Sequence, residues 1–146
     1  MQKKLKLEQH AIAQINMLAN RLMQRSSIAY AKKFGIGIIE WRVIATLYDH
    51  HNFSAQQLAD ILGVDKALIS RTIKKLDTKG YLLVTPDLYD KRILRLNLSE
   101  KGEKLYGIAS EFSYHRENLL LGGLCEKDIE KLFELLKHLS SRINLL

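Results

Sequence analysis

The sequence predicts a mainly α-helical fold that carries one small β-hairpin. Apolar residues recur at helical spacing over most of the chain, and only residues 81–98 change to the alternation typical of strands. A Gly-containing turn joins two short helices within residues 54–80, and the hairpin follows the second of them directly. This order of elements is that of a winged helix-turn-helix, flanked here by long N-terminal and C-terminal helices.

The chain is expected to begin with a long helix from residue 5 to about residue 33, followed by a second helix over about 39–50. The first helix has more apolar positions than one chain of this length can cover, so we expect much of it to pack against another subunit. The second helix should bury one apolar face, formed by Trp41, Ile44, Ala45, Leu47 and Tyr48.

The next signals are those of a helix-turn-helix. A capping box at Ser54 opens a short helix over residues 55–62, which stops at Gly63. Asp65 is a favourable N-cap for the following helix, and Gly80 stands where a left-handed residue usually ends one. The apolar face of that second helix is formed by Leu68, Ile69, Thr72, Ile73 and Leu76.

The opposite face of the second helix has the composition of a DNA-recognition helix. It carries Lys66, Ala67, Ser70, Arg71, Lys74 and Lys75. Short side chains let DNA come close, arginine can reach base edges or phosphates, and lysine suits the phosphate backbone. We add Ser54, at the start of the preceding helix, to the candidate DNA contacts. The same pattern also fits an amphipathic surface helix whose charges are merely solvated.

The hairpin is predicted to have strands near residues 81–85 and 93–98, with a tip rich in turn residues between them. Asp90 and Arg92 stand two apart at this tip, close enough for the carboxylate to hold the guanidinium in place. An arginine held on a thin hairpin suits a narrow, electronegative minor groove, and Lys91 is a further candidate contact. The alternative is an exposed turn whose ion pair contributes little.

Two long helices are expected to end the chain. Ser99 should cap a helix that runs to about Leu121, where Gly122 and the following glycine break it. The last helix should span about 126–144 and is rich in apolar residues. Terminal helices with this much apolar area suggest an intertwined dimer interface.

Composition limits the classes of function. The formal net charge is +7, and the basic excess lies in residues 1–42 and 54–100, which fits a polyanionic partner or simple solubility. The apolar runs are too short and too interrupted by charge to cross a bilayer, and no apolar segment of a secretory signal follows the basic start. The single cysteine suits a reducing cytoplasm. We therefore expect a cytoplasmic protein without a membrane partner.

The sequence offers little for enzyme, metal or redox chemistry. It has no Gly-rich phosphate loop and no nucleophile elbow, so we expect no enzymatic activity and no cofactor. Adjacent His50 and His51 point in different directions on a helix, which argues against a metal site. Cys125 stands at the expected start of the last helix, and an isolated cysteine is more often structural or incidental than redox-active.

Taken together, these segments resemble the MarR family of winged-helix transcription regulators across nearly the whole chain. The D-x-R pattern of the wing, followed by the junction into the next helix, is the most specific part. The resembling residues are Trp41–Ile44, Gln57–Ala59, Val64–Asp65, Ser70–Arg71, Leu76–Tyr81, Asp90–Arg92 and Leu96–Gly102.

The resemblance implies a single domain over residues 1–146, with a DNA-binding lobe at 39–98 and dimerisation helices at 1–34 and 99–146. It further implies a homodimer that binds a pseudo-palindromic operator in double-stranded DNA, usually as a repressor. Family members are often released from DNA by a small effector, frequently phenolic or anionic.

Carried over by position, the resemblance places Ser70 and Arg71 at the major groove and Arg92 at the minor groove, with Asp90 orienting Arg92. The rival interpretation is a winged helix used for protein–protein contact without specific DNA binding. Steep salt dependence of binding to nucleic acid would distinguish a DNA-binding protein from such a module.

Overall fold

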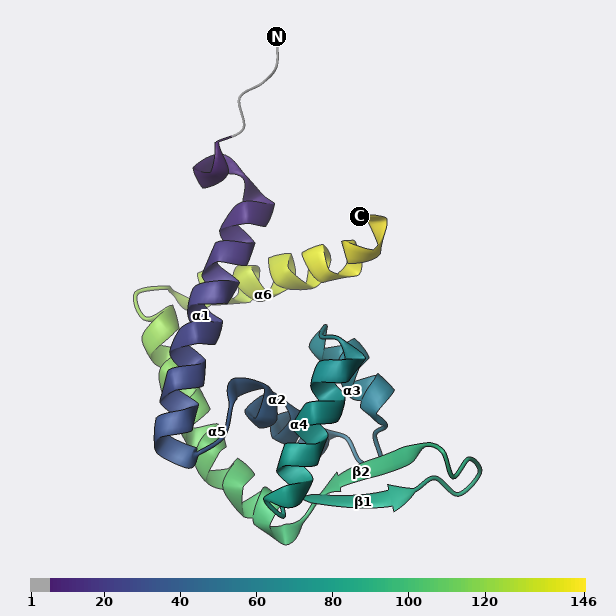
Figure 1. Cartoon of the computed structure of the whole chain (residues 1–146). Coiled ribbons are helices and arrows are strands. Elements are labelled where there is room, and N and C mark those ends of the chain that lie inside the picture. Colours follow the sequence, from purple (N-terminus) through teal and green to yellow (C-terminus); the bar gives the residue numbers. More distant parts are fainter. Residues whose placement is uncertain (1–5) are drawn as a thin grey trace. The chain divides into compact units, whose positions relative to one another are not determined.

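The structure is a computed structural model that describes residues 6–146 (Figure 1). The chain forms two compact units, of which the first ends at Ala109 and the second spans Ser110–Leu146. The expected mainly helical fold with one hairpin is confirmed. The boundary between the units falls within one long helix, and the assignment of residues 1–146 to a single domain stays a prediction.

The N-terminal helix begins later than the sequence predicts. A short 3₁₀ turn at Leu7–Gln9 comes first, and α1 spans Ala11–Phe34. His10 separates the two, and its Nδ1 atom accepts a hydrogen bond from the backbone N–H of Ala13 at 3.3 Å. This N-cap fixes the start of α1. Residue 5, where the helix was expected to begin, lies outside the described residues.

Helix α2 (Ile38–Asp49) supplies much of the core of the first unit. Val43, Ile44 and Leu47 are almost completely buried. The sequence placed Tyr48 on the buried face, which is wrong, because Tyr48 is 47% exposed. Its ring stacks instead on that of Tyr106, with ring centroids 3.7 Å apart.

The helix-turn-helix consists of α3 (Ala55–Leu62) and α4 (Lys66–Thr78). Both hydrogen bonds of the predicted capping box at Ser54 form, and Gly63 ends α3 in the left-handed conformation. Asp65 caps α4 by accepting a hydrogen bond from the backbone N–H of Leu68 at 2.8 Å. The starts of both helices, and the end of α3, are therefore determined by local capping signals that can be recognised in the sequence. Their buried residues are Leu58, Ala59, Ile69, Thr72 and Leu76.

The hairpin pairs β1 (Leu82–Pro86) with β2 (Leu94–Leu98) in antiparallel register. One side of it carries the buried side chains of Leu82, Leu96 and Leu98, which join the core of the first unit. Leu96 also pairs with Phe53, just before α3, so the hairpin is attached to the helix-turn-helix by its base. Its tip extends beyond α3 and α4 (Figure 1).

Helix α5 (Glu100–Leu121) runs from the first unit into the second. Its start is capped as predicted, since Ser99 Oγ accepts a hydrogen bond from the backbone N–H of Gly102 at 3.1 Å. Helix α6 (Glu126–Ser141) ends three residues before the predicted Asn144, and a 3₁₀ turn at Ile143–Leu145 follows. Within residues 6–146, no helix combines the length and apolar character needed to cross a membrane.

Candidate nucleic-acid interface

A groove of about 400 Å³ gathers four of the residues that the sequence singled out. Ser54 comes from the start of α3, Lys66 and Ser70 from α4, and Arg92 from the hairpin. Apolar hairpin side chains, Ile93 among them, complete the groove wall. Three elements that are separate in the sequence therefore present hydroxyl groups and cations to one concave surface.

The other basic residues of α4 lie on a second surface. A depression of about 400 Å³ is lined by Arg71, Lys74, Lys75, Thr78 and Lys79. All six predicted residues on the outer face of α4, including Ala67, are exposed. The predicted contact residues of α4 thus divide between two flanks of the helix, with one flank facing the hairpin and the other carrying most of the positive charge.

The hairpin tip holds Arg92 in a fixed direction, as the sequence predicted. The Nε atom of Arg92 donates to Asp90 Oδ1 at 3.0 Å, and Nη2 donates to Asp90 Oδ2 at 2.9 Å. The backbone N–H of Arg92 donates to the same Oδ1 atom at 3.0 Å. The hydrogen bond from the Arg92 side chain, followed by that from its backbone, lowers the pKa of Asp90, and the carboxylate in turn raises the pKa of Arg92.

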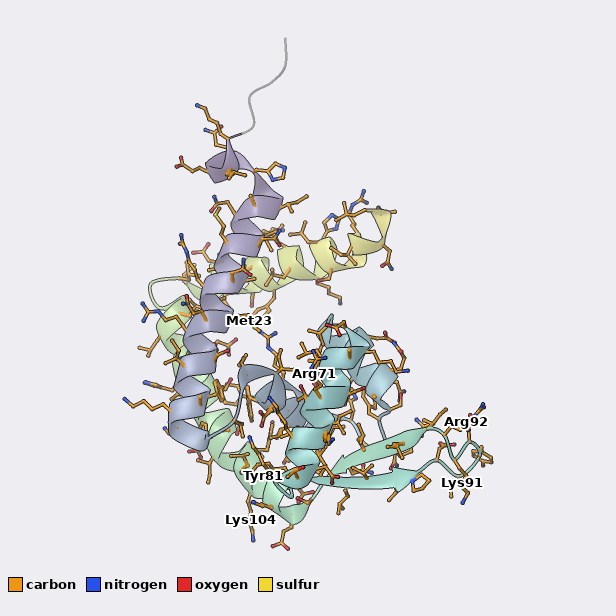
Figure 2. All side chains as sticks on the ribbon, viewed as in Figure 1. Met23, Arg71, Tyr81, Lys91, Arg92 and Lys104 are labelled. Carbon is orange, nitrogen blue, oxygen red and sulfur yellow. The ribbon has the colours of Figure 1, made fainter. Side chains whose placement is uncertain are left out.

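Arg92 is nevertheless available to a partner. Its side chain is 90% exposed, whereas that of Asp90 is 35% exposed. Lys91 is also exposed beside it, and both residues project at the end of the hairpin, away from Arg71 on α4 (Figure 2). A guanidinium held on two nitrogens by a carboxylate still has N–H groups to donate, so the tip can offer directed hydrogen bonds to an anion.

Sequence reasoning missed a second ion pair that supports this tip. Arg95 Nε donates to Asp87 Oδ2 at 2.6 Å, and the two side chains are only 30% and 13% exposed. The hydrogen bond from Arg95, with two more from the backbone N–H groups of Tyr89 and Asp90, lowers the pKa of Asp87 to about 2. An aspartate in a turn-rich segment is a sequence signal for a carboxylate that accepts the backbone N–H two residues further on, as Asp87 does from Tyr89. Its arginine partner, in contrast, is set by the strand register.

The chain is similar to known proteins over most of its length. The MarR family model matches residues 34–93, which contain α2, α3, α4, β1 and the hairpin tip up to Ile93. The chain is 26% identical over 132 residues to an uncharacterized HTH-type transcriptional regulator, YybA, of Bacillus subtilis (strain 168), covering 90% of this chain and 87% of that protein.

Two solved structures share the fold of this chain, and one of them is also considerably more similar in sequence. A MarR/EmrR family transcriptional regulator from Acinetobacter sp. ADP1 is 47% identical, with a TM-score of 0.90 over 97% of this chain and 100% of that one. A MarR family regulator from Listeria monocytogenes, crystallised with a 26mer DNA, shares the fold with a TM-score of 0.85 over 92% of this chain and 89% of that one, at 24% identity. These relatives are regulators of transcription rather than enzymes. This chain belongs to the MarR family of transcriptional regulators.

Proposed function

We propose that this regulator binds double-stranded DNA with α4 in a major groove and the hairpin tip in the adjacent minor groove. The observation that carries the proposal is the shared groove, which places Ser54, Lys66, Ser70 and Arg92 on one concave surface. The Listeria relative in its complex with a 26mer DNA supports a DNA partner for this fold.

The two flanks of α4 suit the two phosphate backbones that border a major groove. Lys66 lies on the flank that faces the hairpin, and Lys74 and Lys75 lie on the other. Ser70 and Arg71 are adjacent in the sequence but belong to different flanks. They therefore lie on either side of the middle of the exposed face of α4, which is opposite its buried face. We assign Ser70 and Arg71 to base edges and the lysines to phosphates.

A homodimer is the second part of the proposal. Helix α1 leaves Ile12, Ile15 and Leu18 between 44% and 55% exposed. Helix α6 has no fully buried residue, although Phe133 and several leucines lie along it. Apolar area of this extent on terminal helices favours a second copy as its cover. We retain residues 39–98 as the DNA-binding lobe and assign 1–34 and 99–146 to dimerisation, with residues 1–5 outside the described part.

A symmetric dimer would present two such lobes, so we propose a pseudo-palindromic operator and repression by occupancy. Release by a small phenolic or anionic effector also stays a prediction. A hollow of about 500 Å³ lies between α2, β2 and the start of α5, and its lining residues include Tyr48, His51 and Glu103. Its lining residues include no lysine or arginine, so this hollow suits an anionic effector poorly.

The test is selection of bound sequences from random double-stranded DNA with the full chain, followed by affinity measurements over a range of salt concentrations. We expect an enriched sequence with two related half-sites, and an affinity that falls steeply with salt because binding to phosphates releases counterions. Sedimentation should show that the protein is a dimer both in the absence of DNA and when bound to it. If no DNA sequence is enriched, and binding to DNA is weak and independent of salt concentration, the result would instead favour a module for protein–protein contact.

A further inference from the structure

We propose that Arg95 is a positioning residue, which holds the hairpin tip relative to the start of α3 and so fixes the direction of Arg92. Arg95 itself contacts the tip rather than DNA. This inference deepens the proposed function and rests on it for its effect on DNA affinity. The effect on the order of the tip can be measured in the free protein.

Arg95 connects three separate segments of the first unit. Its Nε atom donates to Asp87 Oδ2 at 2.6 Å, at the beginning of the tip. Its Nη1 atom donates to the carbonyl oxygen of Asn52 at 3.3 Å and to Gln57 Oε1 at 3.4 Å. Gln57 is the residue whose side chain completes the capping box of α3. One guanidinium therefore bridges β2, the tip and the N-terminal end of α3.

The loop before α3 is itself attached to the hairpin. Asn52 has a positive φ of 56°, and its backbone N–H donates to Asn97 Oδ1 at 2.8 Å. Asn97 Nδ2 donates back to Asn52 Oδ1 at 2.8 Å. The carbonyl group that Arg95 contacts is thus part of a loop fixed by two further hydrogen bonds, so it offers a stable anchor for the guanidinium.

Asp87 connects Arg95 to the backbone of the tip. While Oδ2 receives Arg95, Oδ1 accepts the backbone N–H groups of Tyr89 at 2.9 Å and Asp90 at 3.1 Å. Asp90 then holds Arg92 through its own two carboxylate oxygens. A continuous series of hydrogen bonds therefore leads from the start of α3 through the Arg95–Asp87 pair to the exposed guanidinium.

The Arg95–Asp87 and Arg92–Asp90 ion pairs differ in burial, which indicates different roles. The Arg95–Asp87 pair is 30% and 13% exposed, whereas the Arg92 side chain is 90% exposed. The tip has no apolar packing to replace the pair, because Leu88 and Tyr89 are 87% and 97% exposed. The negative charge of an aspartate near DNA phosphates is by itself unfavourable for binding. A structural role in holding the tip accounts for the presence of Asp87 at this position.

The decisive variant is Asp87→Asn, which keeps the shape of the side chain and removes its charge. If charge alone mattered, losing a negative charge would tighten binding to DNA. If Asp87 instead links Arg95 to the backbone of the tip, binding to DNA weakens about two- to tenfold per subunit. The reason is that the Arg92 side chain, no longer held in the free protein, must be ordered on binding. Glu100→Gln is the matched control: it removes one negative charge from the exposed Glu100–Lys104 pair, where the side chains are 82% and 74% exposed.

Two further measurements show whether the effect passes through Arg92. In an Arg92→Ala background, Asp87→Asn should cost no additional affinity, because there is no guanidinium left to orient. In the free protein, backbone order parameters of residues 88–92 should fall in Asp87→Asn and not in Glu100→Gln. Arg95→Lys, which keeps the charge but not the forked geometry of the guanidinium, should act like Asp87→Asn in all these measurements.

The inference is overturned if Asp87→Asn binds the selected operator as tightly as the parent, or if its loss of affinity persists undiminished in the Arg92→Ala background. Unchanged order parameters at residues 88–92 would also overturn it. If the parent chain binds no DNA, the proposed function fails, while the order parameters still decide whether Arg95 fixes the tip.

Discussion

The recognition helix α4 and the hairpin tip are held in place by different forces. Ile69, Thr72 and Leu76 of α4 are 5% exposed or less and belong to the core. At the tip, Leu88 and Tyr89 are 87% and 97% exposed, and hydrogen bonds to carboxylates fix the backbone. Apolar burial positions the first contact surface, and polar interactions position the second.

The two surfaces should therefore respond differently to substitution. Weaker packing beneath α4 lowers the stability of the whole first unit, because its core is shared with α2, α3 and the hairpin base. Removing a polar interaction at the tip disturbs a local conformation on an exposed turn. Stability and DNA affinity should thus be separable by region.

The largest expected effect is on stability, from Ile69→Ala. Ile69 is 0% exposed, and removing a fully buried isoleucine side chain lowers the free energy of unfolding by about 2–5 kcal/mol. Tyr89→Ala, at a position 97% exposed, should change it by less than about 0.5 kcal/mol. Urea denaturation of both variants measures the contrast. Equal losses of stability would mean that the tip contributes to the folded core after all.

The next effect is on operator affinity, from Arg92→Ala. Losing a charge-assisted hydrogen bond costs roughly 1.5–3 kcal/mol, so two subunits together should lose about a hundredfold in affinity or more. Asp90→Asn leaves the charge of Arg92 and removes only its fixed direction, so its loss of affinity should be smaller. Melting temperatures should stay close to that of the parent for both variants. If Arg92→Ala binds like the parent, the tip does not touch DNA.

A smaller effect distinguishes the side chains of α4 from one another. Lys74→Ala and Lys75→Ala should weaken binding about equally on operator and random DNA, and lower the salt slope by about one for each phosphate that is no longer neutralised. Ser70→Ala and Arg71→Ala should instead reduce discrimination between the two kinds of DNA. Affinities at several salt concentrations on both DNAs provide the measurement. An equal weakening on both DNAs for Arg71→Ala would reassign Arg71 to the phosphate backbone.

The same contrast explains how much the sequence could predict. Helix α3 has the expected bounds because its capping box and Gly63 are local signals. The Asp90–Arg92 pair could be read from a spacing of two residues. Tyr48 was wrongly placed because helical spacing does not reveal that its ring rests on Tyr106 from α5.

The Arg95–Asp87 pair was missed for a related reason. The two residues lie eight positions apart and meet only through the pairing of β1 with β2. The hydrogen bonds of Arg95 with Asn52 and Gln57 span 43 and 38 positions in the sequence. Which side chains meet across such distances depends on the register of the hairpin and on how its base attaches to α3, and neither is encoded by local periodicity.

The last and smallest effect is a response of the tip to acid. The ordinary pKa of an aspartate is 3.8, and the hydrogen bond from Arg95 is the main reason that the pKa of Asp87 falls to about 2. A carboxyl group whose pKa is lower in the folded state stabilises that state above its unfolded pKa. The contribution of Asp87 should therefore be complete above about pH 4 and disappear as the pH falls through about 2.

Carbon chemical shifts of the carboxyl groups, followed from about pH 5 downwards, test this directly. At about pH 3 Asp87 should still be mostly ionised, although an unperturbed aspartate would be mostly protonated. In Arg95→Lys the midpoint should move up toward the ordinary value, because the forked hydrogen-bonding geometry is absent. A midpoint near 3.8 in the parent would mean that Arg95 and Asp87 are not paired in solution. The Asp90–Arg92 pair would then be the remaining ion pair that orders the tip.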